Sequence, residues 1–217
     1  MSTNEKRVTR DKITLGFSIA IIIGEIVGLV MCTRNIGWEL FRYYTQDSNL
    51  FLLIATVIWS ACVARRLRDG VPVPCWVRVL KYMATCTVAL TLTVVMAVLA
   101  PMGVDSMRNL LFSGSMLWCH TLCPILAIVA SVFFDTMPDL QIRDTAVALI
   151  PTVLYGIVSV LLNVLQIWYG PYPFLYVYEQ PIWVSLVWIV VIVGGAWFLS
   201  FLLYCGNRVA TREYVYH

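Results

Sequence analysis

The stretch IWVSLVWIVVIVGGAWFLSFLLYC, Ile182–Cys205, decides the fold class of this chain. It contains no charged residue, and about 20 apolar residues in a helix are enough to cross a bilayer. The chain contains five more long apolar stretches: Ile13–Cys32, Tyr43–Ala64, Val79–Ala100, Leu110–Phe134 and Ala146–Gln166. We therefore predict an all-α polytopic membrane protein, a bundle of six transmembrane helices that forms one domain over residues 1–217.

The composition agrees with this prediction. The chain is 60% hydrophobic and only 12% charged, whereas soluble domains carry about 25% charged residues. The connections between the apolar stretches are too short for a second domain. The first stretch is not expected to be a cleavable signal peptide, because it is too long and no Ala-x-Ala site follows it.

The positive residues are distributed unevenly along the chain. If the N-terminus is cytoplasmic, 12 of the 15 Lys and Arg residues fall on the cytoplasmic side, and the outside keeps Arg34, Arg42 and Arg108. Cytoplasmic loops are enriched in Lys and Arg, so we expect both termini to be cytoplasmic. We also expect the protein to lie in the plasma membrane. Because the basic clusters then act as topology signals, no nucleic-acid partner is expected.

The cysteines and the histidine give no sign of a metal or disulfide framework. Seven cysteines is an odd number without a disulfide spacing, so free thiols packed as small apolar groups are expected. His120 with Cys119 and Cys123 supplies too few zinc ligands, and neighbouring helical positions point about 100° apart. We therefore expect no metal and no cofactor, and the oligomeric state stays open.

The second stretch opens with the polar run Thr45-Gln46-Asp47-Ser48-Asn49. Thr45, Ser48 and Asn49 share one helix face through their i, i+3 and i+4 spacing. Three polar groups on one face of a membrane helix are not expected to point at lipid. Either they cap and order the start of the helix, or they line a site together with Asp47.

His120 is the only histidine inside an apolar stretch, about 15 Å along its helix at 1.5 Å per residue. Pro124 removes a backbone donor one turn later, so carbonyl groups freed there need partners or water. A structural role for His120 stays open, but a titratable group at this depth favours a functional one, in the lining of a polar cavity near the outer side.

Glu25 lies near the middle of the first stretch, between Gly24 and Gly28. The GxxxG spacing allows a neighbouring helix to approach closely. A carboxyl group at this depth should face the bundle interior. It is either a neutral group hydrogen-bonded to another helix, or a group that handles protons or orients a site.

Three short motifs occur in order along the chain: Phe41-Arg42-Tyr43-Tyr44-Thr45 followed by Ser48-Asn49-Leu50, then His120-Thr121-Leu122-Cys123-Pro124, then Tyr172-Pro173-Phe174-Leu175. In these motifs and in its helix layout the chain resembles the androgen-induced, ADTRP-like family of six-helix membrane threonine hydrolases, and its bacterial-type members in particular. The resemblance implies a membrane-embedded lipid ester hydrolase that cleaves fatty-acyl esters, among them fatty acid esters of hydroxy fatty acids.

The resemblance also implies site residues. Thr45 becomes the nucleophile and His120 the base that accepts its proton. Ser48, one turn further on, is a rival nucleophile. Ser113, Ser115 and Asn49 are candidate donors to the oxyanion.

Two other functions stay open. One is an acyltransferase on the same scaffold, in which Cys119 or Cys123 is the nucleophile. The other is a transporter or interaction protein without catalysis, in which Glu25, Asp47 and His120 form a proton or solute path.

Overall fold

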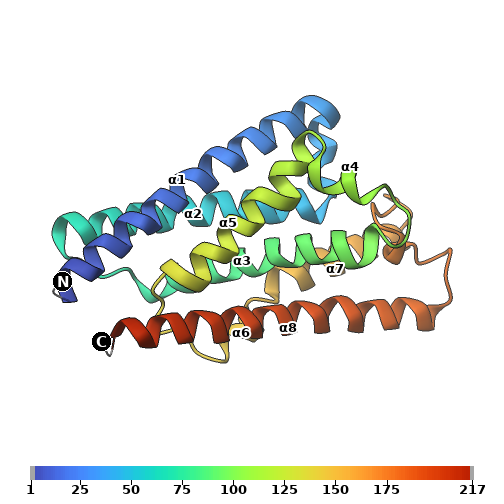
Figure 1. Ribbon diagram of the computed structural model, residues 1–217. Coiled ribbons are helices and arrows are strands. Elements are labelled where there is room, and N and C mark those ends of the chain that lie inside the picture. The colour runs from blue at the N-terminus through green and yellow to red at the C-terminus, as the bar shows by residue number, and fades with distance from the viewer. Residues whose placement is uncertain (1–2, 216–217) are drawn as a thin grey trace.

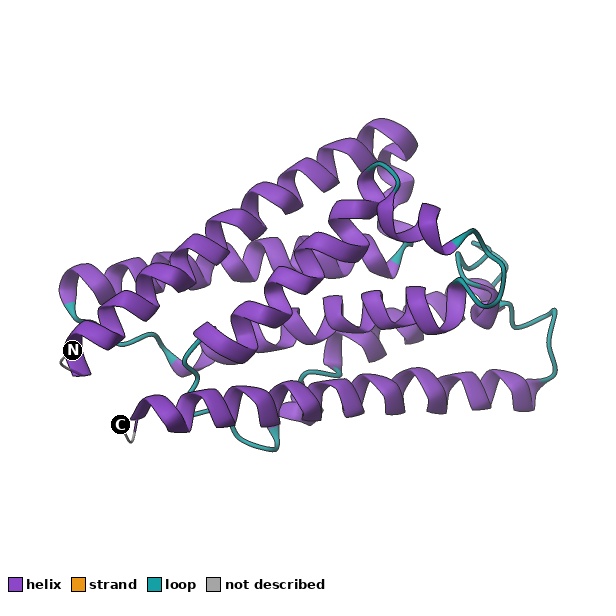
Figure 2. Ribbon diagram, in the orientation of Figure 1, coloured by secondary structure: helices purple, strands orange, loops and turns teal. Residues whose placement is uncertain are grey.

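The computed structural model describes residues 3–215 and confirms the predicted all-helical architecture (Figures 1 and 2). No strand occurs in this part of the chain. By length and composition, six of its helices are able to cross a membrane. The two chain ends lie at the same end of the bundle, as an even number of spans requires (Figure 1).

The first three spans are regular. They are α1 (Thr3–Ile36), α2 (Tyr44–Asp69) and α3 (Cys75–Val94), with the 3-10 turn η1 (Gly37–Arg42) before α2 and the π-helical turn η2 (Val95–Leu99) after α3. The helix α2 ends at Asp69 because Gly70 takes the left-handed conformation, with φ of 73°. Leu52, Trp59 and Val63 of α2 are fully buried and fix its inner face.

The second half of the bundle is more interrupted. It comprises α4 (Met107–Phe112), η3 (Leu117–Leu122), α5 (Cys123–Val129), η4 (Ala130–Phe134), α6 (Asp144–Val147), α7 (Ile150–Val164), η5 (Pro173–Leu175) and α8 (Ile182–Val215). Of these, η3 and η4 are π-helical and η5 is a 3-10 turn. The fourth span is therefore one helix that changes its winding twice, from η3 through α5 to η4.

The fourth and fifth spans differ from the sequence prediction. The stretch Leu110–Phe134 is not one helix, because α4 ends at Phe112 and Gly114 adopts a left-handed φ of 53° that starts a new direction. The stretch Ala146–Gln166 is also divided, since α6 ends at Val147 and α7 begins at Ile150, immediately before Pro151. Both breaks set the ends of helices that surround the candidate site.

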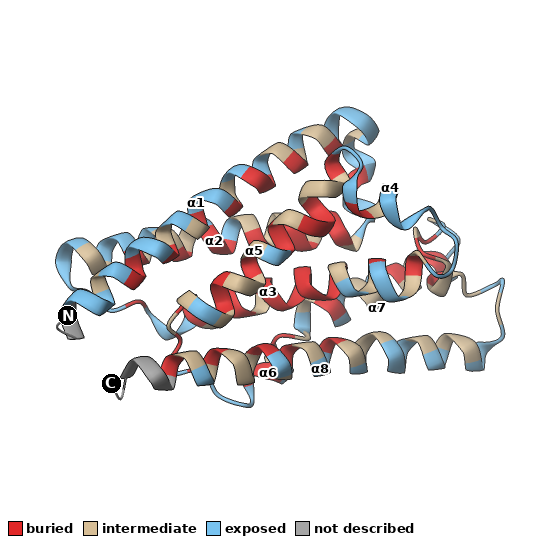
Figure 3. Cartoon of the chain, in the orientation of Figure 1, coloured by how far each residue is buried: buried red, intermediate tan, exposed pale blue. Residues whose placement is uncertain are grey.

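The helix α3 lies at the centre of the bundle. Of its most apolar segment 61% is buried, against 17% for α8, which exposes large apolar side chains along its length (Figure 3). The predicted close approach at Gly24 and Gly28 is confirmed. A Cβ atom added at Gly24 would lie 2.7 Å from Cys123 Sγ, and one at Gly28 would lie 2.9 Å from Cys119 Sγ.

A buried polar cluster lies near the end of the bundle that carries the termini. Lys81 Nζ is 3.8 Å from Asp135 Oδ2, and both side chains are about 1% exposed. Asn207 Nδ2 donates to the carbonyl oxygens of Ser131 and Asp135, at 2.6 and 2.8 Å. These contacts connect α3 and α8 to the end of η4. In lipid, hydrogen bonds between helices are one of the main contributions to helix association.

Candidate functional site

The polar start of α2 faces the bundle interior, as the spacing predicts. Thr45, Ser48 and Asn49 are 7%, 3% and 3% exposed. The Ser48 hydroxyl donates to the Thr45 carbonyl oxygen at 2.9 Å, and Asn49 Nδ2 donates to the same oxygen at 2.6 Å. None of the three caps the helix, since Tyr43 occupies the N-cap and no side-chain cap bond occurs there. The three residues therefore do not cap the helix, although Ser48 and Asn49 order its first turn through the Thr45 carbonyl.

Thr45 lies in the wall of a cavity of about 390 Å³. Residues of α2, α3, η2, α7, η5 and α8 line it, and almost all of its surface is apolar. Two lining residues of α7 and α8, Ile157 and Ile189, are each 52% exposed on the bundle surface. The cavity thus opens between α7 and α8 toward the surface that faces lipid, and its size lies in the range of ligand sites.

Tyr172 places a phenol hydroxyl directly at Thr45. The backbone N–H of Thr45 donates to Tyr172 Oη at 3.5 Å, and this hydroxyl also interacts with the Thr45 side chain. Burial raises the pKa of Tyr172 to about 12, so the phenol stays protonated at neutral pH and remains a hydrogen-bond donor. Tyr172 opens the third sequence motif, but no local pattern in the sequence places it at Thr45.

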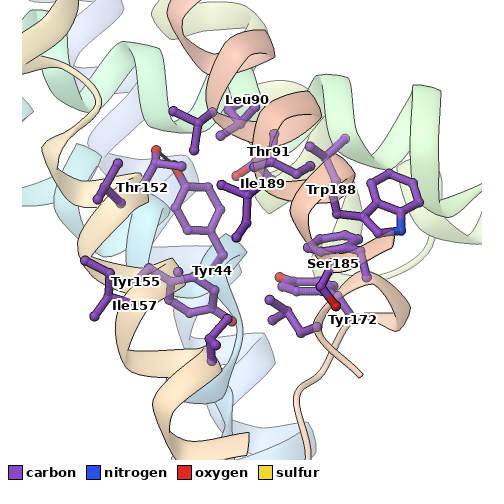
Figure 4. Close-up of a pocket in the computed structure, with 18 of the residues that line it drawn as sticks. Tyr44, Leu90, Thr91, Thr152, Tyr155, Ile157, Tyr172, Ser185, Trp188 and Ile189 are labelled. Carbon is purple, nitrogen blue, oxygen red and sulfur yellow. Dashed lines mark hydrogen bonds between the residues drawn. The ribbon is translucent and has the colours of Figure 1, made fainter. Parts of the chain in front are cut away.

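Two aromatic rings form another part of the cavity wall. Tyr44 and Tyr155 pack edge to face with ring centroids 5.2 Å apart. The Tyr44 hydroxyl lies 2.7 Å from Thr152 Oγ1, and the Tyr155 hydroxyl donates to the Arg42 carbonyl oxygen at 2.7 Å. Figure 4 shows Tyr44, Thr152 and Tyr155 together on one side of the cavity and Tyr172 on the other. Hydrogen bonds at both phenol groups hold this wall in place.

His120 is held by one of its two ring nitrogens. Its Nδ1 lies 2.6 Å from the carbonyl oxygen of Leu110, in the last turn of α4. Because a carbonyl only accepts, Nδ1 carries the proton, and in the neutral ring Nε2 carries the lone pair. Within residues 3–215 no hydrogen bond occupies Nε2. The break at Gly114 makes this arrangement possible, since it leaves the last carbonyl groups of α4 without helical partners.

The start of α2 and the turn that carries His120 are joined by Asn49. In a π turn, the carbonyl of residue i accepts from the N–H of residue i+5. Cys123 N–H accordingly bonds the Trp118 carbonyl. The next donor in this register is Pro124, which has no N–H. The Cys119 carbonyl is thereby left free, and Asn49 Nδ2 donates to it at 3.1 Å.

In the part of the chain that the structure describes, His120, Ser113 and Ser115 form no hydrogen bond with Thr45. His120 does not line the cavity, and across the described chain no hydrogen bond joins it to Thr45. Ser113 is exposed, Ser115 is buried, and neither lines a cavity. Asp47 and Ser48 line a second cavity.

Glu25 lies elsewhere again, on α1. It is 2% exposed and hydrogen-bonds the Cys123 thiol, with the charge of Lys81 nearby. This contact agrees with a carboxyl group that bonds a neighbouring helix. Glu25 is also not in the lining of either cavity, so its position lends no support to a direct role at Thr45.

The site offers the buried Thr45 hydroxyl beside the protonated phenol of Tyr172. The imidazole of His120 belongs to the residue that follows Cys119, whose carbonyl accepts a hydrogen bond from Asn49. Comparison of the chain with known protein families, with curated proteins and with solved structures found no match.

Proposed function

We propose that the protein is a membrane-embedded hydrolase of fatty-acyl esters, of the threonine hydrolase type that its motifs resemble. The observation that carries the proposal is the Thr45 hydroxyl in the wall of an apolar cavity that opens between α7 and α8. Such a cavity suits an acyl chain, because each buried methylene contributes about 0.8 kcal/mol. The substrate class is an ester with a long acyl chain, among them a fatty acid ester of a hydroxy fatty acid.

Thr45 is the nucleophile and His120 the base in this proposal. Thr45 Oγ1 attacks the ester carbonyl carbon while His120 Nε2 accepts its proton. The tetrahedral intermediate expels the alcohol oxygen, to which His120 returns the proton. Water then attacks the acyl-threonine while His120 accepts its proton. The second tetrahedral intermediate breaks its bond to Thr45 Oγ1, His120 returns the proton to that oxygen, and the fatty acid leaves.

The phenol of Tyr172 fits the role of donor to the developing oxyanion. It already lies at Thr45, and its raised pKa keeps its proton available at neutral pH. The proton transfer to His120 requires the η3 turn and the start of α2 to draw together when the ester binds. Catalytic hydrogen bonds are often long in the unliganded enzyme and tighten in the complex.

The proposal includes the orientation of the chain. The proposal puts both termini in the cytoplasm, because the Lys and Arg residues gather at the end that carries the termini. It also puts the protein in the plasma membrane. The start of α2, and the cavity with it, then lies in the outer half of the bilayer.

The other two functions have less support. The thiols of an acyltransferase would be Cys119 and Cys123, but both are buried and neither lines a cavity. A solute path through Glu25, Asp47 and His120 would need these groups to adjoin, and no contact between them occurs in residues 3–215.

Hydrolysis of a medium-chain nitrophenyl ester by the detergent-purified protein tests the proposal. Thr45→Val removes the nucleophile at nearly constant shape and should abolish the activity, whereas Thr45→Ser should retain part of it. Ser48→Ala is the matched control and should keep a measurable rate. Full activity in Thr45→Val contradicts the assignment, and loss in Ser48→Ala alone moves the nucleophile to Ser48.

A further inference from the structure

A second cavity, of about 340 Å³, shares the Tyr44 and Tyr155 walls with the cavity of Thr45. It lies between α2 and α7. Three more aromatic residues line it, Phe41, Phe51 and Trp168, so five rings surround one space. None of the proposed catalytic steps uses this space.

Asp47 is the one charged residue in the lining of this cavity. It is half-buried, and within the described chain no Lys or Arg side chain lies at ion-pair distance from its carboxylate. Its place in the first turn of α2 lets the helix dipole stabilise the negative charge. The cavity lining therefore offers a single anionic group, and no Lys or Arg of the described chain forms an ion pair with it.

The aromatic rings select the kind of cation. Ring faces attract cations, and the Arg42 guanidinium already lies 5.9 Å from the centroid of Trp168. A primary ammonium would need several acceptors to replace its water. The hydroxyls of Ser48 and Thr87 already bond other residues, so Asp47 and the Ser159 hydroxyl are the acceptors left in the lining. A quaternary ammonium has no N–H donors to satisfy, and aromatic cages commonly bind it.

The position of the cavity indicates where such a group comes from. Leu154 and Val158 of α7 line the cavity and are 57% and 52% exposed on the lipid-facing surface. A ligand can thus enter sideways from the bilayer. We propose that this cavity binds the quaternary-ammonium headgroup of a membrane lipid, with Asp47 as its counter-ion and the five rings as its cage.

Direct binding tests this inference without catalysis. Radiolabelled hexadecyltrimethylammonium is titrated into the full chain in neutral maltoside micelles, and bound ligand is measured by equilibrium dialysis. Saturable binding is expected for the wild type, and binding at least about tenfold weaker for Asp47→Asn and for Trp168→Leu. Glu179→Gln removes an exposed charge outside the cavity and is the matched control. Thr45→Val should bind as the wild type does, which separates this inference from the proposed hydrolysis.

Competition defines the ligand class. Dodecylphosphocholine should displace the probe, whereas hexadecanol should not. Equal binding to the wild type and to Asp47→Asn, or equal displacement by hexadecanol, overturns the cation site. Displacement by free choline as potent as that by dodecylphosphocholine overturns the assignment to a lipid. If Asp47→Asn does not elute as a folded protein on size exclusion, Trp168→Leu alone decides between these outcomes.

Discussion

At the scale of single residues, the two nitrogens of His120 carry different roles. Nδ1 donates to the Leu110 carbonyl and holds α4 in place, while Nε2 is the nitrogen that would accept a proton. An asparagine side chain can reproduce the Nδ1 donor but supplies no base. The structural and the chemical contribution of this residue can therefore be separated by mutation.

We expect His120→Asn to unfold within about 1 kcal/mol of the wild type while its ester hydrolysis falls by about 10²–10⁴. His120→Ala should lose the activity and about 1–3 kcal/mol of stability, because the buried carbonyl loses its donor. The rate and the free energy of unfolding in mixed micelles check both values. A wild-type rate in His120→Asn would leave His120 only its structural role.

At the scale of elements, the turn η3 and the start of α2 depend on each other through the Cys119 carbonyl. Asn49 supplies the donor that Pro124 withholds. Asn49→Ala should therefore cost about 1–3 kcal/mol of stability. Pro124→Ala returns a backbone N–H in the register of the π turn.

The double variant Asn49→Ala/Pro124→Ala should recover part of the stability that Asn49→Ala loses. Unfolding free energies of the four proteins of this double-mutant cycle give the coupling between the two sites. Strictly additive losses would mean that Asn49 does not replace the donor missing at Pro124.

The elements differ in how far the sequence predicts them. The six spans follow from hydropathy, and the inward face at Thr45, Ser48 and Asn49 follows from helical spacing. The break at Gly114 lies in a stretch whose flanks are both helical, so hydropathy alone does not reveal it. The location of Tyr172 at Thr45 depends on how a loop packs over other helices, which no local pattern encodes.

At the scale of the whole molecule, the buried ion pair of Lys81 and Asp135 and the candidate site lie at opposite ends of the bundle. Lys81 and Asp135 pair near the termini, 54 positions apart in sequence, and their pairing is a product of tertiary packing, which brings Asp135, directly after η4, to α3. Asp135→Asn leaves a buried cation without a counter-ion, which costs about 3–5 kcal/mol.

Adding Lys81→Met to Asp135→Asn should restore most of this loss, since a pair of neutral groups replaces the ion pair. Denaturant unfolding in mixed micelles measures the recovery. If Lys81→Met instead lowers the free energy of unfolding of the Asp135→Asn variant further, the two charges do not stabilise one another.

Labelling of one native thiol tests on which side of the membrane the loop before α3 lies. Cys75 is the exposed cysteine at the start of α3, and the other six are buried or half-buried. With cytoplasmic termini, a membrane-impermeant maleimide should label Cys75 only after the cells are permeabilised. Cys75→Ser should abolish this labelling. Labelling in intact cells that Cys75→Ser removes would reverse the topology.

The proposed hydrolysis requires Thr45 to be an activated nucleophile in an apolar site. A long-chain alkyl fluorophosphonate tests it most directly, because an activated hydroxyl displaces fluoride and keeps the phosphonyl group as a stable adduct. Mass spectrometry of the digested protein should find one adduct on Thr45, absent in Thr45→Val and strongly reduced in His120→Asn. An adduct on Ser48 or on a cysteine, or no adduct on the folded wild type, would contradict the claim.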